Sequence, residues 1–100
     1  MWGLLCLNRN HRIIHERTVF VGGLIATTAN AREIYQIALK YNAASIIVAH
    51  NHPSGDPTPS EADVRATDIL KKAWEYIGIP LYDHIIIGND YYSFKSDFLI

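Results

Sequence analysis

The sequence is poor in cysteine, and this excludes two kinds of stabilisation at once. Cys6 is the single cysteine among 100 residues, so an internal disulfide has no second partner. A structural zinc site rich in cysteine is excluded as well, because such sites draw several ligands from thiolates. Cys6 lies in an apolar run and is expected in the core.

Long hydrophobic segments are also missing. No apolar run approaches the roughly 20 residues that a membrane-spanning helix needs, and no basic segment followed by an apolar leader opens the chain. We therefore expect a cytoplasmic protein that does not use a membrane. A chain of 100 residues is near the commonest domain size and suffices for one hydrophobic core, which predicts a single domain over residues 1–100.

An excess of positive charge is the third absence. Nine Lys and Arg residues stand against ten Asp and Glu residues, for a net charge of −1. Domains that follow a phosphate backbone are usually distinctly basic. The composition therefore argues against nucleic-acid binding as the main activity, and Lys71 and Lys72 are better explained as part of a solvated helix face.

Residues 50–63 carry the most informative pattern in the chain. The segment has His50 and His52 one residue apart, then seven residues, Ser60, two residues and Asp63. Four residues at these spacings would occur by chance in roughly one chain in two thousand, the false-positive check that a motif requires. The spacing is typical of a metal site.

The local structure expected around this segment explains the spacing. Ser45–Ala49 is a short β-branched apolar run that predicts a buried strand. Residues i and i+2 of a strand share one face, so His50 and His52 point to the same side. A loop rich in proline and glycine follows, and a helix opens at Ser60 with Asp63 in its first turn.

Two imidazoles and one carboxylate leave a fourth coordination position open, which is the arrangement of a catalytic zinc. Ser60 and Asp63 also fit a helix N-terminus, in which serine caps the third helical amide. The two interpretations are compatible, because a cap decides where the first turn begins and hence where the Asp63 carboxylate points. Two histidines in a loop could otherwise be merely solvated. The strand before them and the acid after them favour the metal site.

The apolar patterns along the rest of the chain predict an α/β fold, a mixed β-sheet flanked by helices, with a helix on each side. Gly22 and Gly23 end the second expected strand, and Gly78 ends the second helix. Trp74, Tyr76, Tyr82 and Phe94 are expected in the core. The expected strands cover residues 2–7, 12–21, 45–49, 81–87 and 91–94, and the expected helices cover residues 30–41 and 60–77.

His50-x-His52, seven residues, Ser60, two residues and Asp63 resembles the JAMM motif of the JAB/MPN metalloprotease-like domains. The form His50-Asn51-His52-Pro53-Ser54-Gly55-Asp56-Pro57-Thr58-Pro59-Ser60 is similar to the RadC group of that superfamily, whose usual family name is DNA repair protein. The resemblance extends from about Leu4 to the end. Further RadC-like stretches are Ala31-Arg32-Glu33-Ile34, Asn42-Ala43-Ala44 and Asp83-His84-Ile85-Ile86-Ile87-Gly88.

The resemblance implies a JAB/MPN fold, one zinc per chain held by His50, His52 and Asp63, and Ser60 near the bound water. Zinc can lower the pKa of its water from about 15.7 to about 7, and Ser60 could stabilise a developing oxyanion. Hydrolysis of a peptide or isopeptide bond in a protein or peptide substrate is therefore expected. The alternative is a catalytically inactive metal-binding interaction module, or one associated with DNA repair.

JAB/MPN enzymes take their general base from a glutamate on an early strand, and the RadC-like pattern puts that position just before Met1. The first strand is accordingly expected to be truncated at its N-terminus. The four glutamates in the chain fit the role poorly. Glu33 suits a helix cap and Glu16 falls outside the motif, while Glu75 lies far along a helix and Glu61 should project from another side than Asp63.

His84 lies among the apolar residues of the expected strand 81–87. A histidine buried in the core is the simpler interpretation. A contact with a metal-binding histidine, which would orient that ligand, is the alternative.

Overall fold

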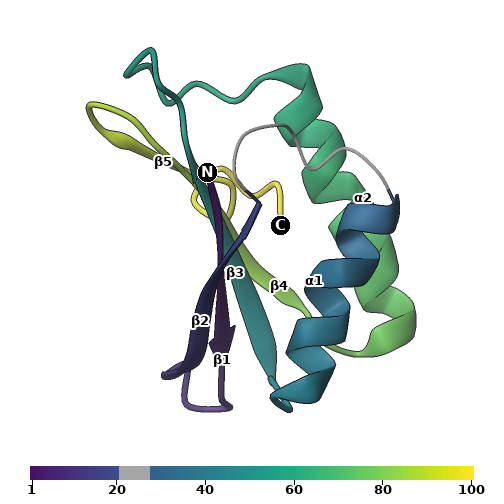
Figure 1. Ribbon diagram of the computed structural model, residues 1–100. Coiled ribbons are helices and arrows are strands. Elements are labelled where there is room, and N and C mark those ends of the chain that lie inside the picture. Colours follow the sequence, from purple (N-terminus) through teal and green to yellow (C-terminus); the bar gives the residue numbers. More distant parts are fainter. Residues whose placement is uncertain (21–27) are drawn as a thin grey trace.

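The computed structural model describes residues 1–20 and 28–100. Figure 1 shows a single sheet with two helices packed against it. The strands run in the order β2-β1-β3-β4-β5, and only the β3–β4 pair among them is parallel. The elements are β1 (Trp2–Leu7), β2 (Ile13–Phe20), α1 (Thr28–Lys40), β3 (Ser45–Asn51), α2 (Glu61–Ile77), β4 (Leu81–Ile87) and β5 (Tyr91–Ser93).

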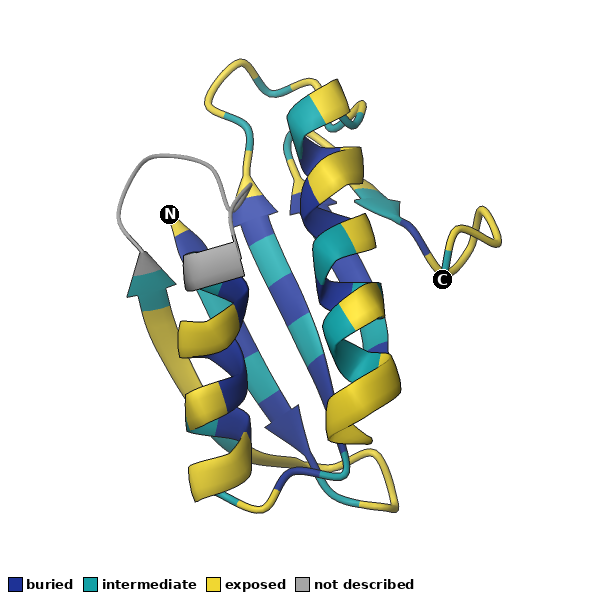
Figure 2. Ribbon diagram, turned by 90° about the vertical axis from the view of Figure 1, so that its right-hand side faces the viewer, coloured by how far each residue is buried: buried dark blue, intermediate teal, exposed yellow. Residues whose placement is uncertain are grey.

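Both helices cover the same face of the sheet, as the two views in Figure 1 and Figure 2 show. The α/β class and the mixed sheet are confirmed, whereas the expectation of a helix on each side is wrong. The strand order explains this. β2 and β3 are both antiparallel to β1 and therefore parallel to each other, and β4 is parallel to β3. The crossovers from β2 to β3 and from β3 to β4 step the same way across the sheet, so two right-handed connections put both helices on one side.

Most element bounds lie within two residues of those expected. β1 and β4 match exactly, and α1 begins two residues earlier than expected. The largest difference that bears on function is in β3, which continues to Asn51 and therefore includes His50. The end of the expected strand 12–21 and the break at Gly22 and Gly23 lie outside the described residues.

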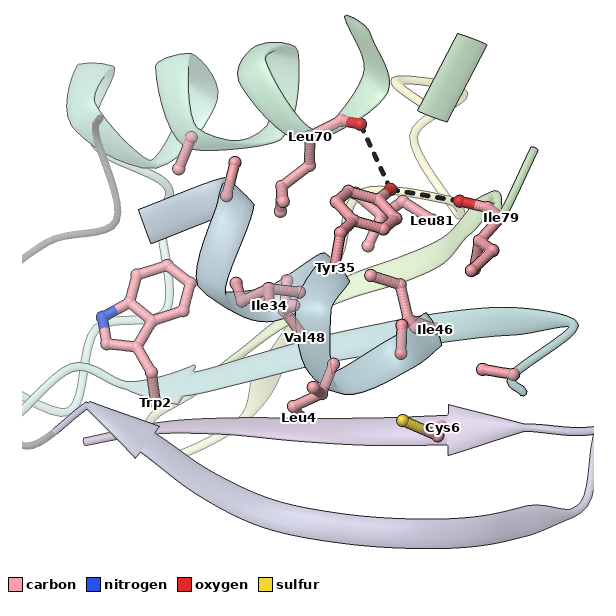
Figure 3. Packing of buried hydrophobic residues seen from close by; sticks show 14 residues of the cluster. Trp2, Leu4, Cys6, Ile34, Tyr35, Ile46, Val48, Leu70, Ile79 and Leu81 are labelled. Carbon is pink, nitrogen blue, oxygen red and sulfur yellow. Dashed lines mark hydrogen bonds between the residues drawn. The ribbon is translucent and has the colours of Figure 1, made fainter. Parts of the chain in front are cut away.

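The core lies between the helices and the inner face of the sheet (Figure 3). Alternate residues of β1 point inward, and Trp2, Leu4 and Cys6 are all buried there, as expected of Cys6. The Tyr35 hydroxyl from α1 donates to the backbone oxygens of Leu70 at 3.3 Å and Ile79 at 3.1 Å. This side chain therefore ties α1 to the α2–β4 region without leaving its polar atom unpaired.

Phe94 is buried as expected, but Tyr76 is 92% exposed. Tyr76 comes six residues after the buried Leu70, which is about one and two-thirds turns at 3.6 residues per turn, so it points away from the core. Among the described residues, neither helix is both long and apolar enough to cross a membrane.

Candidate metal centre

The two histidines and the aspartate of the motif come together at one end of the sheet. His50 is the penultimate residue of β3 and His52 follows the strand directly. Asp63 arrives from the first turn of α2, where Ser60 is the N-cap. The serine Oγ accepts from the Asp63 amide at 3.1 Å, and Asp63 Oδ2 accepts from the Ser60 amide at 2.9 Å. This capping box aims the carboxylate at the histidines.

The donor atoms of the three side chains lie within 4.8 Å of one another, and the group could hold a metal ion. His50 Nε2 is 3.2 Å from His52 Nε2 and 3.1 Å from Asp63 Oδ1. His52 Nε2 is 3.0 Å from Asp63 Oδ2. Because His50 and Asp63 are buried, water has little room to satisfy these atoms.

Hydrogen-bond partners decide which of these atoms carry protons. His52 Nδ1 lies 2.9 Å from the backbone oxygen of Asp56. A carbonyl oxygen only accepts, so in the neutral ring the proton is on Nδ1 and Nε2 presents a lone pair. Asp63 Oδ1 is buried and accepts no hydrogen bond. The His52 Nε2 lone pair thus faces the carboxylate at Oδ2, and Oδ1 is left unpaired beside His50 Nε2. Such an arrangement is costly without a cation, so the residues present fit a metal ion.

Burial also controls the charge states. Desolvation lowers the pKa of His50 to about 4 despite the opposing attraction of Asp63. Burial by itself would raise the pKa of Asp63, but the hydrogen bonds from Ser60 and the two neighbouring imidazoles hold it below its ordinary value. At neutral pH the pair is therefore a neutral imidazole and a carboxylate, which is the form that binds metals.

The loop that carries His52 is held by the turn between β4 and β5. The His52 amide donates to the backbone oxygen of Ile87 at 2.9 Å, and the Asn89 amide donates to that of Gly55 at 2.6 Å. Gly55 has φ +87°, a conformation that favours glycine. A Cβ on Gly88 would lie 2.3 Å from the Gly55 oxygen. The two segments can approach this closely only because residue 88 has no side chain.

β1 brings its first residues to the same end of the sheet (Figure 1). Trp2 pairs with His50 across the antiparallel β1–β3 ladder. The indole stacks on the His50 ring with centroids 3.8 Å apart and planes 12° apart. This contact restricts rotation of the imidazole and excludes water from one of its faces.

His84 is fully buried in β4 and contacts the candidate ligand His50. Its Nε2 is 3.1 Å from His50 Nδ1, and its Nδ1 is 2.6 Å from Thr67 Oγ1. Desolvation lowers its pKa to about 3. The structure thus unites the two interpretations of His84, because a core histidine is also the neighbour of His50. Sequence reasoning missed Thr67, although it comes one helical turn after Asp63, and Trp2, whose position depends on strand pairing.

The candidate acid and base residues lie as follows. Ser60 is exposed at the start of α2, and its hydroxyl keeps a proton to donate while it accepts from Asp63. None of the four glutamates belongs to the metal-ligand group found among the described residues. Glu16 lies on β2, where it pairs with Leu5 of β1, and all four glutamates are exposed.

Comparison with known proteins agrees with the motif and the fold. The sequence matches the family described as RadC-like JAB domain over residues 2–99. It is 51% identical over 93 residues to a UPF0758 protein of Listeria monocytogenes, covering 92% of this chain and 42% of the relative. A UPF0758 protein of Clostridium botulinum is 52% identical over 94 residues, covering 93% and 41%. The chain thus spans about two fifths of the length of these relatives.

Proposed function

Because the chain belongs to the RadC-like JAB domain family, we propose that it is a zinc-dependent hydrolase domain that cleaves peptide or isopeptide bonds. The observation that carries this proposal is the convergence of His50, His52 and Asp63, with an unpaired carboxylate oxygen among them. Because the matched relatives are longer, the proposal concerns the chemistry of this domain.

The donor set supports zinc as the ion and one ion per chain. Two histidines and one carboxylate with a further position open form the usual catalytic zinc arrangement. When bound, the ion would activate water near neutral pH and polarise a carbonyl group. Nickel or copper can fill the same set, since affinity order alone does not favour zinc, so the metal must be identified by analysis of the purified protein.

We assign three tasks to the residues of the chain itself. The Asp63 carboxylate supplies negative charge in a buried setting, held in place by the Ser60 amide at 2.9 Å. The Ser60 hydroxyl donates to the oxyanion that develops on the scissile carbonyl. His52 keeps its Nε2 lone pair directed at the site through the hydrogen bond from Nδ1 to the Asp56 oxygen.

The general base is proposed to be a glutamate directly before Met1. The strand register supports this position, because Trp2 pairs with His50 across the antiparallel β1–β3 ladder. Because this pair of strands is antiparallel, a residue directly before Met1 would lie opposite His52. Its side chain would share the face of Trp2 and His50, because strand side chains alternate. A carboxylate there could accept the proton of the attacking water and pass it to the leaving amine.

Metal analysis and a chain extended by one glutamate test the proposal. The parent is expected to hold about one zinc per chain, and His52→Ala is expected to lose most of it. The extended chain should hydrolyse an amide substrate about 10²–10⁴-fold faster than a chain extended by glutamine, with equal zinc content, because only the carboxylate serves as a base. Absence of zinc in the parent, or unchanged zinc in His52→Ala, would contradict the metal site.

A catalytically inactive metal-binding interaction module is the second candidate. It is favoured by one observation, the absence of a glutamate from the metal-ligand group in the part of the chain that the structure describes. Screening the glutamate-extended, zinc-loaded chain against a peptide library distinguishes the two. Zinc binding without any metal-dependent cleavage would favour the interaction module over the hydrolase.

A further inference from the structure

A buried hydrogen-bonded chain runs from His50 away from the metal-ligand group. His50 Nδ1 is 3.1 Å from His84 Nε2, and His84 Nδ1 is 2.6 Å from the hydroxyl of Thr67. All three side chains are buried, with exposures of 4% for His50, 0% for His84 and 3% for Thr67. These hydrogen bonds thus connect His50, a candidate metal ligand on β3, to the hydroxyl of Thr67 on α2 through His84 of β4.

The protons in this chain can point in only one of two directions while both rings are neutral. In one direction the Thr67 hydroxyl donates to His84, His84 Nε2–H donates to His50, and His50 carries its proton on Nε2, the atom that faces the site. In the other, His50 Nδ1–H donates to His84 and His84 Nδ1–H donates to Thr67. Only this second direction leaves a lone pair on His50 Nε2.

We propose that His84 and Thr67 are positioning residues that hold His50 in the tautomer whose Nε2 is free to bind metal. The proposal rests on the metal site of the proposed function and adds two residues to it. His84 accepts the His50 Nδ1 proton, and Thr67 accepts the His84 Nδ1 proton.

The packing around His84 supports this role. Its ring stacks on Phe94 with centroids 4.4 Å apart and planes 6° apart, and it tilts against Trp2 at 5.3 Å. The ring therefore cannot turn away from His50 without moving two aromatic neighbours.

The position of Thr67 on α2 supports its role as the last acceptor in this series of hydrogen bonds. Asp63 and Thr67 are four residues apart in one helix and lie on the same face. A threonine hydroxyl has two lone pairs besides its proton, so Thr67 Oγ1 can accept the proton of His84 Nδ1, which lies 2.6 Å away. One helix face thus supplies both a metal ligand and the acceptor that ends the hydrogen-bonded chain.

Zinc affinity of single variants tests the proposal. Thr67→Val removes the hydroxyl while keeping a similar shape, and the zinc Kd should rise about 10–100-fold, as is typical when the partner of a ligand histidine is lost. Thr67→Ser retains the hydroxyl and should restore binding close to that of the parent. Tyr35→Phe is the matched control, because it removes another buried hydroxyl that bonds Leu70 and Ile79. It should lower stability and leave the zinc Kd unchanged.

The tautomers can be measured directly in the parent protein by long-range ¹⁵N–¹H correlation of its histidine rings with zinc bound. The expected result is a proton on Nδ1 of both His50 and His84. A proton on His84 Nε2, or a Thr67→Val Kd equal to that of the parent, would overturn the positioning role while leaving the metal site intact. A parent that binds no zinc, measured by competition with a chromogenic chelator, would overturn the metal site and the positioning role together.

Discussion

Asp63→Asn separates the two tasks of this side chain, because asparagine can keep the helix cap and lose the metal. The amide oxygen can still accept from the Ser60 amide, which donates to Asp63 Oδ2 at 2.9 Å. The new NH₂ group would take the place of Oδ1, which is buried without a hydrogen bond and lies 3.1 Å from His50 Nε2. There it can donate to an imidazole lone pair. Without metal, the variant should therefore be at least as stable as the parent.

With zinc bound, the parent should become more stable than Asp63→Asn. At a free zinc concentration of 100 times the Kd, binding stabilises the parent by about 2.7 kcal/mol, which raises the Tm of a domain of this size by roughly 11–22 °C. A structural zinc is worth about 10–16 kcal/mol over four ligands, so one ligand contributes roughly 3 kcal/mol, or about 100-fold in Kd. At the same zinc concentration the variant would gain only about 0.4 kcal/mol, a rise of roughly 2–3 °C.

Thermal unfolding with chelator and with buffered zinc measures both quantities. Glu61→Gln is the matched control, since it removes the other acid from the first turn of α2 and is exposed. It should keep the full zinc-dependent rise in Tm. The reasoning is refuted if Asp63→Asn rises with zinc as far as the parent, or if the metal-free variant is destabilised by more than the roughly 1 kcal/mol that a lost cap costs.

Three more outcomes can be tested on the same protein. The pKa values of His50 and His84 are lowered to about 4 and about 3 in the folded protein, so the unfolded chain binds protons at a higher pH than the folded one. Urea unfolding with chelator should therefore show full stability above about pH 6.5 and a loss of a few kcal/mol between about pH 6.5 and 3. Gly88→Ala should displace the loop of His52 and weaken zinc binding measured by chelator competition, because its Cβ would lie 2.3 Å from the Gly55 oxygen. Gly78→Ala should cost about 1 kcal/mol of stability and leave zinc binding unchanged, since it has φ +78° but nothing within 4 Å of its Cβ.

The parts of the fold that follow from local pattern could be predicted from the sequence. β1 alternates inward and outward residues and ends at a polar turn, and its bounds were predicted exactly. The start of α2 was predicted from Ser60 and Asp63, which form the expected capping box. The convergence of His50, His52 and Asp63 follows from the same local rules, because strand alternation and a helix cap each direct a side chain.

The arrangement of the helices could not be predicted in this way. It depends on β1 lying between β2 and β3, a pairing between segments distant in sequence that makes both crossovers step in one direction. The contact between Gly88 and Gly55 and the stack of Trp2 on His50 have the same origin. Each depends on which strands are neighbours, and no residue pattern within either segment indicates it.

The stack of Trp2 on His50 gives the site an optical reporter of its own. The chain has two tryptophans, and Trp2 lies with its ring 3.8 Å from that of a candidate ligand. In a Trp74→Phe background all indole emission would come from this one position. Cobalt bound beside His50 would quench that fluorescence, and an excess of zinc would displace the cobalt and restore it. Occupancy could then be followed in real time on unlabelled protein.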